Sequence, residues 1–423
     1  MNENIVDLES MGRAARVAGR LLAKLDAAVK NEALKQIVEG ISARQGEVLA
    51  ANEQDLKVGR GDGLSDSLLD RLALDSERMD ALIADVRKVA ALPDPLSERF
   101  DVRQMPNGLR VGKRRVPLGV IGAIYESRPN ITVDFAVLSI KSGNALILRG
   151  GREAIRTNSA LVGLIRGCIE EAGVPPDAVQ FVESPDRALV GQMLGMKEYI
   201  DLMVPRGGNE LVQRVASDAT MPAVIGGIGV CHTYVDRAAD DDMAVEIAYN
   251  AKVSRPSVCN AMDTLLVHAA AAPSILPRLA LRWAEVGVEM RCDRRALSIL
   301  GSADVGKILP AVDDDWGTEF LSLTAAVKIV DTLDEALEHI ATYGSGHSEA
   351  IVTEDYSAAN RFLDEVDAAV VFVNASTRFN DGGQMGLGAE VAISTNKFHA
   401  RGPMGLRELT SYKWTVEGSG QIR

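Results

Sequence analysis

The sequence has few cysteines and few aromatic residues. Its 423 residues include 4 cysteines, and aromatic residues make up 4% of the chain. Four thiols with no Cys-x-x-Cys pair are too few for a disulfide scaffold, and they lack the ligand spacing of a structural zinc site. The sequence therefore predicts free thiols in a reducing, cytoplasmic environment and no bound metal.

The chain also has fewer positively charged than negatively charged residues. The chain has 46 Lys and Arg residues against 59 Asp and Glu residues, which gives a formal net charge of −13. Such a surface repels phosphate backbones, so nucleic acid is not expected as a partner. The two dense acidic runs, 240–242 and 313–315, predict solvated loops or helix starts.

Long hydrophobic runs are missing as well. No segment reaches the roughly 18 consecutive apolar residues that a membrane span requires. The opening residues, MNENIVDLES, lack the basic and apolar regions of a signal peptide. No membrane association is expected.

The length predicts more than one folded lobe, because a single hydrophobic core rarely grows beyond about 250–300 residues. The first ninety residues have helical patterning. Apolar residues recur at steps of three and four from Leu8 to Val29, which predicts helical structure packed on its own domain, with a partner-binding coiled coil as the alternative. A later helix is predicted to begin at Asp75 and to end before Pro93.

Beyond residue 100 the patterning changes to strands and helices. Pro106-Asn107-Gly108 predicts a hairpin turn between strands at 100–105 and 109–116. Strands and helices then alternate, and a Gly- and Pro-rich stretch at 222–240 separates two such regions. This alternation predicts an α/β fold with largely parallel sheets. The predicted strands are 118–125, 145–149, 200–204, 264–268, 326–330, 350–353 and 369–373, and the helices are 131–142, 157–172, 243–252, 274–286 and 333–342.

Two Arg-Gly-Gly triplets stand where a predicted strand runs into a helix. They are Arg149-Gly150-Gly151 and Arg206-Gly207-Gly208. Glycines there let backbone N–H groups approach an anion, and a helix N-terminus favours negative charge. The pair indicates a phosphate-bearing cofactor, and tight turns without a ligand are the alternative.

Cys259 lies in a loop between a predicted helix and a predicted strand, close to Arg255. A nearby guanidinium favours the thiolate, although most lone cysteines are small core residues. His347, in a Gly- and Ser-rich segment, is a candidate acid or base near neutral pH or a histidine that only caps a turn. Residues 380–388 form an irregular stretch that suits the lining of a site.

These segments resemble those of the gamma-glutamyl phosphate reductase family, which belongs to the aldehyde dehydrogenase superfamily. The similarity runs nearly end to end, with Ser254 standing where the family is expected to have Gln. The segments that carry it are IYESRPNITVD (124–134), LRGGREA (148–154), RPSVCNAMDTLLVH (255–268), HIATYGSGHSEAIVT (339–353) and RGPMGLRELTSYKW (401–414).

The resemblance implies an aldehyde dehydrogenase-like fold with two Rossmann-like parallel-sheet lobes and a small β oligomerisation arm. It divides the chain into an NADP-binding domain (1–100 and 117–230), a catalytic domain (231–385), and an oligomerisation arm and tail (101–116 and 386–423). In the family the arm and the tail pair across subunits, so we expect a homodimer or homotetramer.

For the chemistry, the resemblance implies NADPH-dependent reduction of L-glutamyl 5-phosphate to L-glutamate 5-semialdehyde and phosphate, a step of proline biosynthesis. Cys259 takes the position of the catalytic thiol, and Asn130 is the candidate side-chain donor to the oxyanion. The superfamily's deacylating Glu is missing from the matching residues 224–227, so a thioester on Cys259 would persist. The candidates for binding the substrate are Arg128, Arg255, His347 and Ser348.

The resemblance also bears on the cofactor. Many NAD-dependent relatives have a Lys at the position of Arg149 and a Glu, which binds the adenosine ribose, at the position of Arg152. Two guanidinium groups would instead attract a 2′-phosphate, which favours NADPH. The expected cofactor-binding residues are Arg149, Gly150, Gly151, Arg152, Arg206, Gly207, Gly208 and Glu319, of which Glu319 would hold the nicotinamide ribose.

Two other functions stay open at this stage. A CoA-acylating aldehyde dehydrogenase also lacks the deacylating Glu, and a non-catalytic member of the fold could serve as a binding protein. No kinase segment is fused to the chain, so a separate glutamate 5-kinase is expected to supply the acyl phosphate, with transient contact between the two enzymes as a possibility.

Overall fold

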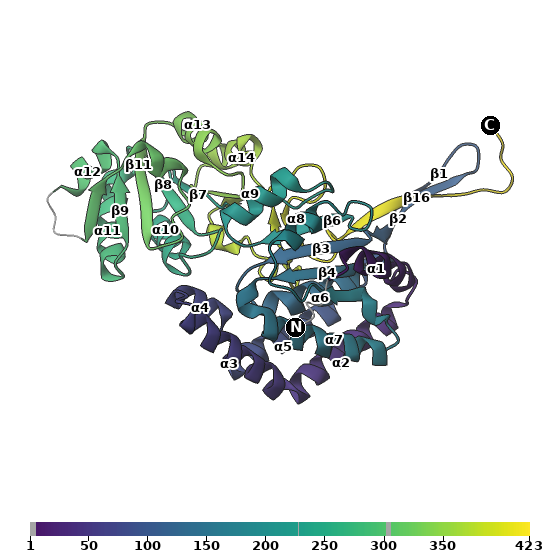
Figure 1. The fold of residues 1–423 in the computed structure, drawn as a ribbon. Coiled ribbons are helices and arrows are strands. Elements are labelled where there is room, and N and C mark those ends of the chain that lie inside the picture. The colour runs from purple at the N-terminus through teal and green to yellow at the C-terminus, as the bar shows by residue number, and fades with distance from the viewer. Residues whose placement is uncertain (1–5, 227, 302–305) are drawn as a thin grey trace. The chain divides into compact units, whose positions relative to one another are not determined.

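The structure is a computed structural model that describes residues 6–226, 228–301 and 306–423. It consists of two compact units (Figure 1). Unit 1 contains the chain up to residue 225 together with residues 386–392 and 403–423, and unit 2 contains residues 226–385 and 393–402. The roles assigned above to 1–100, 117–230, 231–385, 101–116 and 386–423 remain predictions.

A four-stranded parallel sheet forms the centre of unit 1, in the order β5-β4-β3-β6. Every residue of β3 and β4 is buried, because helices cover both faces of the sheet. The four strands are β3 (Val120–Tyr125), β4 (Ala145–Gly150), β5 (Val179–Phe181) and β6 (Leu202–Arg206).

The helices of unit 1 divide between the two faces of this sheet. One face packs on α1 (Leu8–Leu22), α8 (Ala188–Leu194) and α9 (Asn209–Asp218), with Val120, Ile124, Ala145 and Ile147 in the shared core. The other face packs on α6 (Asn130–Ser142) and α7 (Ile155–Glu171). The remaining helices of this unit are α2 (Ala27–Ala43), α3 (Gln45–Gly61), α4 (Asp66–Leu72) and α5 (Ser76–Ala91).

The N-terminal helices confirm the helical patterning and correct its continuity. The apolar stripe that runs on to Val29 crosses a break, because α1 ends at Leu22 and Asp26 takes an extended conformation before α2. The predicted start at Asp75 is confirmed, since its carboxylate accepts the Arg78 N–H at 2.7 Å and caps α5.

The predicted hairpin is confirmed and gains a third strand. β1 (Arg99–Gln104) and β2 (Arg110–Pro117) are antiparallel, and β16 (Thr410–Glu417) pairs with the other edge of β2. The tail thus pairs with the arm of its own chain. Pairing of the arm and the tail across subunits remains a prediction. The ammonium group of Lys113 lies 4.7 Å and 4.9 Å from the ring centres of Tyr412 and Trp414, an arrangement that stabilises the charged arm.

Seven parallel strands form the sheet of unit 2, in the order β10-β9-β11-β8-β7-β12-β13. Alternate residues of β8 face opposite cores, with Leu265 and Val267 on one side and Leu266 on the other. The strands are β7 (Cys231–Val235), β8 (Met262–His268), β9 (Glu289–Cys292), β10 (Lys307–Pro310), β11 (Thr324–Val330), β12 (Ser348–Val352) and β13 (Val370–Val373).

The helices of unit 2 cover both faces of its sheet. The first face carries α10 (Asp241–Val253), α11 (Ala272–Glu285) and α12 (Arg294–Leu300), and the second carries α13 (Leu333–Tyr343) and α14 (Tyr356–Glu365). Both acidic runs are confirmed as helix starts, since Asp240 caps α10 and residues 313–315 begin a short 3₁₀ helix. Two short strands, β14 (Ile393–Ser394) and β15 (Gly402–Pro403), pair with each other.

Gly143 provides a test of this helical packing. It ends α6 with φ +82°, and a Cβ there would lie 2.8 Å from Leu96 Cδ1. We expect Gly143→Ala to destabilise the protein by about 1–2 kcal/mol, because L-residues disfavour the left-handed conformation. Thermal unfolding should show a lower midpoint than in the parent protein.

The matched control is Gly167→Ala in the interior of α7. Gly167 has ordinary helical geometry, and a Cβ there would meet no atom within 4 Å. Its midpoint should rise, because alanine reduces the entropy of the unfolded chain. If the thermal unfolding midpoints of Gly143→Ala and Gly167→Ala shifted equally from that of the parent protein, the left-handed turn at Gly143 would be contradicted.

Candidate active site

The thiol of Cys259 lies in the loop between α10 and β8, at the amino ends of the parallel strands of unit 2. Cys259 is half-buried. Its carbonyl oxygen accepts a hydrogen bond from Cys231 Sγ at 3.1 Å, and a Cβ on Gly229 would lie 1.6 Å from that same oxygen. Only glycine fits at position 229, so the backbone of residue 229 holds the thiol loop in place.

Behind this loop lie side chains that are buried. Cys231 is fully buried, and burial raises the pKa of its thiol well above the ordinary value. His347 Nδ1 lies 2.7 Å from Ser348 Oγ and 3.7 Å from Cys231 Sγ. Ser348 Oγ also accepts a hydrogen bond from Asn380 Nδ2 at 2.8 Å. Through Cys231, His347 and Ser348 thus support the thiol loop. Their contact with substrate remains a prediction.

Glu319 is linked to the thiol loop through Gly229. Its Oε1 accepts the Gly229 N–H at 3.0 Å, and burial raises the pKa of its carboxyl group. The next residue, Phe320, donates its N–H to Asp263 Oδ1 at 3.1 Å. Asp263 forms a buried ion pair with Lys252 at 3.3 Å. This pair anchors the segment that carries Glu319.

Arg378 is a residue of this region that the sequence analysis missed. Its Nε donates to Ser254 Oγ at 3.1 Å. Burial lowers the pKa of Arg378, and the positive charge of Arg255 lowers it further, whereas Cys259 acts in the opposite direction. Two guanidinium groups therefore act electrostatically on one another near the thiol. The irregular stretch at 380–388 was the only sequence signal close to it.

In unit 1 the predicted cofactor residues lie at the carboxyl ends of the parallel strands, where ligands bind in sheets of this type. Two carboxylates that the sequence analysis missed lie among them. Glu126 Oε2 accepts the Gly208 N–H at 2.9 Å. Glu153 Oε1 accepts the N–H and the hydroxyl of Ser127 at 2.7 Å and 2.8 Å. An anion that used the Gly208 N–H would have to displace Glu126.

The two arginines predicted to select the cofactor differ in exposure. Arg149 is 8% exposed, and its Nε forms no hydrogen bond with any residue that the structure describes. Burial lowers the pKa of Arg149. The Arg152 side chain is 66% exposed, with Asp62 at 3.8 Å as its ionic partner. An orphaned buried nitrogen and an open guanidinium fit a phosphate-bearing cofactor.

Asn130 is the first residue of α6, which follows Arg128 and Pro129. Its amide Nδ2 donates to Asp134 Oδ2 at 3.2 Å, one helical turn away. Burial raises the pKa of Asp134 to about 7. One amide hydrogen of Asn130 is thus engaged by Asp134, and a second remains to donate elsewhere.

Comparisons with known proteins agree with this arrangement. Residues 3–302 match the model of the aldehyde dehydrogenase family. The chain is 55% identical over 423 residues to a gamma-glutamyl phosphate reductase of Dehalococcoides mccartyi, with all of both chains covered. It is 54% identical to one of Roseiflexus castenholzii, which covers 99% of this chain and 100% of the relative. The crystal structure of the enzyme from Thermotoga maritima superposes with a TM-score of 0.95 at 45% identity, covering 99% of this chain and 100% of that one.

The chain belongs to the gamma-glutamyl phosphate reductase family. The protein is an oxidoreductase with an aldehyde dehydrogenase fold, as predicted. Within the described residues, no helix is long and apolar enough to cross a membrane, and no group of three His, Cys, Asp or Glu side chains is placed to hold a metal ion.

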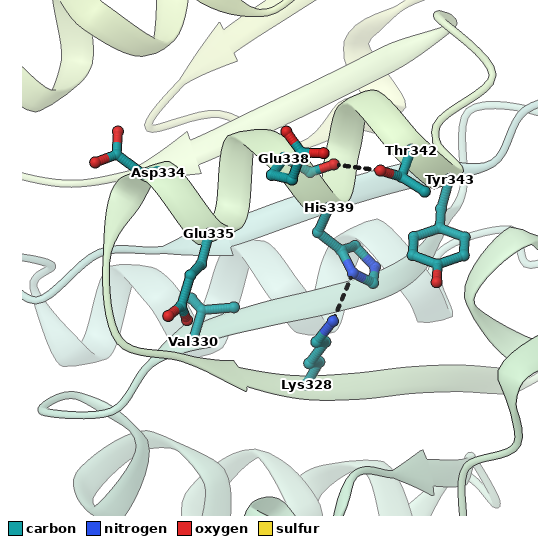
Figure 2. A pocket seen from close by; sticks show the side chains of 8 residues that line it. All are labelled: Lys328, Val330, Asp334, Glu335, Glu338, His339, Thr342 and Tyr343. Carbon is teal, nitrogen blue, oxygen red and sulfur yellow. Dashed lines mark hydrogen bonds between the residues drawn. The ribbon is translucent and has the colours of Figure 1, made fainter.

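Unit 2 contains a polar pocket that none of the predicted site residues lines. It has a volume of about 560 Å³ and lies along α13 and β11 (Figure 2). Lys328 Nζ donates to His339 Nδ1 at 3.0 Å, as Figure 2 shows. Burial, together with electrostatic interactions with His232 and Lys328, lowers the pKa of His339 to about 3. His339 is therefore neutral in the folded protein near neutral pH.

This neutral histidine makes stability depend on pH. Below about pH 6.5 the unfolded chain protonates His339, whereas the folded chain does not until about pH 3, so folding loses free energy as the pH falls. We expect the unfolding free energy of His339→Gln to fall less steeply with decreasing pH than that of the parent protein. The two slopes should differ by up to about 1.4 kcal/mol per pH unit.

The measurement is denaturant unfolding of the parent and the variant between pH 7 and pH 4.5. Their difference in unfolding free energy should shrink as the pH falls. Parallel curves would show that His339 takes up its proton equally in both states.

Proposed function

We propose that the protein reduces L-glutamyl 5-phosphate to L-glutamate 5-semialdehyde and phosphate, a step of proline biosynthesis, with NADPH as the reductant. The observation that carries this proposal is the thiol loop. Cys259 is half-buried, its backbone is packed on Gly229, and the Nδ2 of the neighbouring Asn260 donates to the Arg378 carbonyl at 3.4 Å. The family membership of the chain supports the same reaction.

In the first step the Cys259 sulfur attacks the acyl carbon of the acyl phosphate. A carbon–sulfur bond forms, and phosphate leaves with the electron pair of the carbon–oxygen bond. Arg255 and Arg378 would stabilise the negative charge of the departing phosphate. The developing oxyanion would accept hydrogen bonds from the Cys259 N–H and from the Asn130 amide.

The thioester on Cys259 must then survive attack by water. Val224, Ile225 and Gly226 supply no carboxylate to activate a water molecule, and residue 227 lies outside the described residues. The nicotinamide cofactor, when bound, would supply the hydride, with its two electrons, that reduces the thioester carbonyl. Collapse of the resulting thiohemiacetal releases the aldehyde and regenerates the Cys259 thiolate.

Cofactor binding is assigned to the carboxyl ends of β3, β4 and β6 and to Glu319. Arg152 and Arg149 would hold the 2′-phosphate, since one guanidinium is exposed and the other has an orphaned Nε. Glu319 would bind the nicotinamide ribose, held in place by Gly229 and by the Lys252–Asp263 pair. The glycines expected at the cofactor phosphates are Gly150, Gly151, Gly207 and Gly208, next to Arg206.

Several assignments of the sequence analysis stay predictions. Arg128, Arg255, His347 and Ser348 are proposed to bind substrate. A homodimer or homotetramer, a cytoplasmic location and a transient contact with glutamate 5-kinase are likewise proposed.

The reverse reaction tests the function, because the acyl phosphate is unstable. Purified protein with glutamate 5-semialdehyde, NADP⁺ and phosphate should produce NADPH, measured by its absorbance, at a rate that depends on phosphate. Cys259→Ala should lower this rate by about 10⁴-fold or more, because it removes the nucleophile.

Cys168→Ala is the matched control for the thiol. Cys168 is also half-buried but lies within α7 of unit 1, so this variant should keep the parent rate. A rate that depends on CoA, and not on phosphate, would favour the CoA-acylating alternative. No NADPH from either co-substrate would contradict the proposed reductase activity.

Arg152→Glu tests the choice of cofactor. A carboxylate at this position would repel a 2′-phosphate, and a lost ionic hydrogen bond costs about 1.5–3 kcal/mol. The ratio of kcat/KM for NADP⁺ to that for NAD⁺ should fall by about tenfold to a hundredfold. Arg156→Glu in α7, whose arginine is paired with Asp55, should leave this ratio unchanged. An unchanged ratio in Arg152→Glu would remove Arg152 from the cofactor site.

A further inference from the structure

Unit 1 contains a second cavity that the proposed reaction does not use. Its volume is about 850 Å³, within the range of small-molecule pockets. It is lined by the end of α1, the start of α2, residues 94, 96 and 97, the end of β2, the start of β3 and Lys413 of β16. All of these segments belong to unit 1.

The lining of this cavity is strongly basic, although the chain as a whole carries a net charge of −13. Its only carboxylates among the described residues are Asp26 and Asp94. Its cationic residues are Arg16, Arg20, Lys24, Lys30, Arg114, Arg115 and Lys413. Such a concentration of one sign of charge attracts small anions.

Three of the seven cations have ionic partners. Lys30 is fully buried and pairs with Asp94, Arg115 pairs with Glu98, and Arg16 pairs with Asp201 at 2.7 Å. The other four form no ion pair with any residue in 6–226, 228–301 or 306–423. These four are Arg20, Lys24, Arg114 and Lys413.

Two of the four unpaired cations face each other directly. Lys413 of β16 is the register partner of Arg114 of β2 in the antiparallel pair. Like charges in directly opposite positions destabilise a sheet unless a counter-ion lies between them. Their placement therefore costs stability in the free protein and favours a bound anion.

The start of α2 adds hydrogen-bond donors to the same cavity. Asp26 and Ala27, which begin this 17-residue helix, both line it. The Asp26 side chain accepts no hydrogen bond from the first turn. The first N–H groups of the helix and its positive dipole end thus remain available to an anion.

We propose that this basic cavity binds a small molecule that carries two or more phosphate groups. A diphosphate group has enough charge to neutralise several of the four unpaired cations within a cavity of this size. The site is distinct from the proposed cofactor turns, because Val120 at the start of β3 lines it, whereas those turns follow the ends of the strands. The six residues of β3 separate the two positions by about 17 Å.

The test is calorimetric titration of the full-length protein with inorganic pyrophosphate at constant ionic strength. We expect a saturable site, one per chain, that weakens by about tenfold or more in the double variant Arg114→Ser/Lys413→Ser. Arg20→Ser, a single change on α1, should weaken the same site. A thermal melt of each variant verifies that it is folded.

Two control variants locate the binding. Arg103→Ser removes an exposed cation of the same arm outside the cavity, and Arg152→Glu alters the proposed cofactor turn. Both should keep the affinity of the parent protein. Loss of binding in Arg152→Glu with retention in the double variant would place pyrophosphate at the cofactor turn and overturn the proposal.

The other outcomes also decide the matter. Absence of saturable binding to the parent protein would overturn the proposal. Sedimentation of the parent protein and the double variant identifies one alternative. If the parent protein does not bind pyrophosphate and the double variant differs from it in oligomeric state, the cavity is an interface between copies of the chain and not a ligand site.

Discussion

The close packing of Gly229 on the carbonyl of Cys259 is the constraint on which the candidate active site depends. A Cβ at position 229 would lie 1.6 Å from that oxygen, so no other residue fits there. The N–H of the same glycine donates to Glu319. One residue without a side chain thus joins the proposed nucleophile to the residue proposed to bind the nicotinamide ribose. Their relative position within unit 2 is therefore determined by backbone packing, which side-chain rotation cannot relax.

Local charge, and not the net charge of the chain, decides where anions can bind. The chain carries −13 overall, yet cations gather in three places: at Arg255 and Arg378, at Arg149 and Arg152, and in the basic cavity of unit 1. Buried cations with a carboxylate partner are neutralised, as in the pair Lys252–Asp263 and, within the basic cavity, the pair Lys30–Asp94. The electrostatic field of an unpaired cation can attract an anionic ligand, whereas the field of a paired cation is largely cancelled by its carboxylate partner.

Elements with strong local signals were predicted well from the sequence. The helix α6 ends at Gly143 as expected, because the left-handed turn there favours glycine, and Pro106-Asn107-Gly108 turns the hairpin between β1 and β2. Short elements were missed, among them β5 with three residues and α8 with seven. Such short segments contain too few residues to show a period. The break between α1 and α2 was missed because the apolar spacing continues through it.

The sequence by itself determined the two parallel-sheet regions, the family, and the candidate residues Cys259, Arg149 and Arg152, because periodicity, turn residues and motifs are local properties of the chain. Only the tertiary structure decided their surroundings. It brought Arg378 to the thiol loop, placed Glu126 on the Gly208 N–H, and paired β16 with β2 of the same chain. These contacts join residues from 82 to about 300 positions apart. Periodicity reports which face of an element is buried, but side-chain packing between distant elements selects the partner.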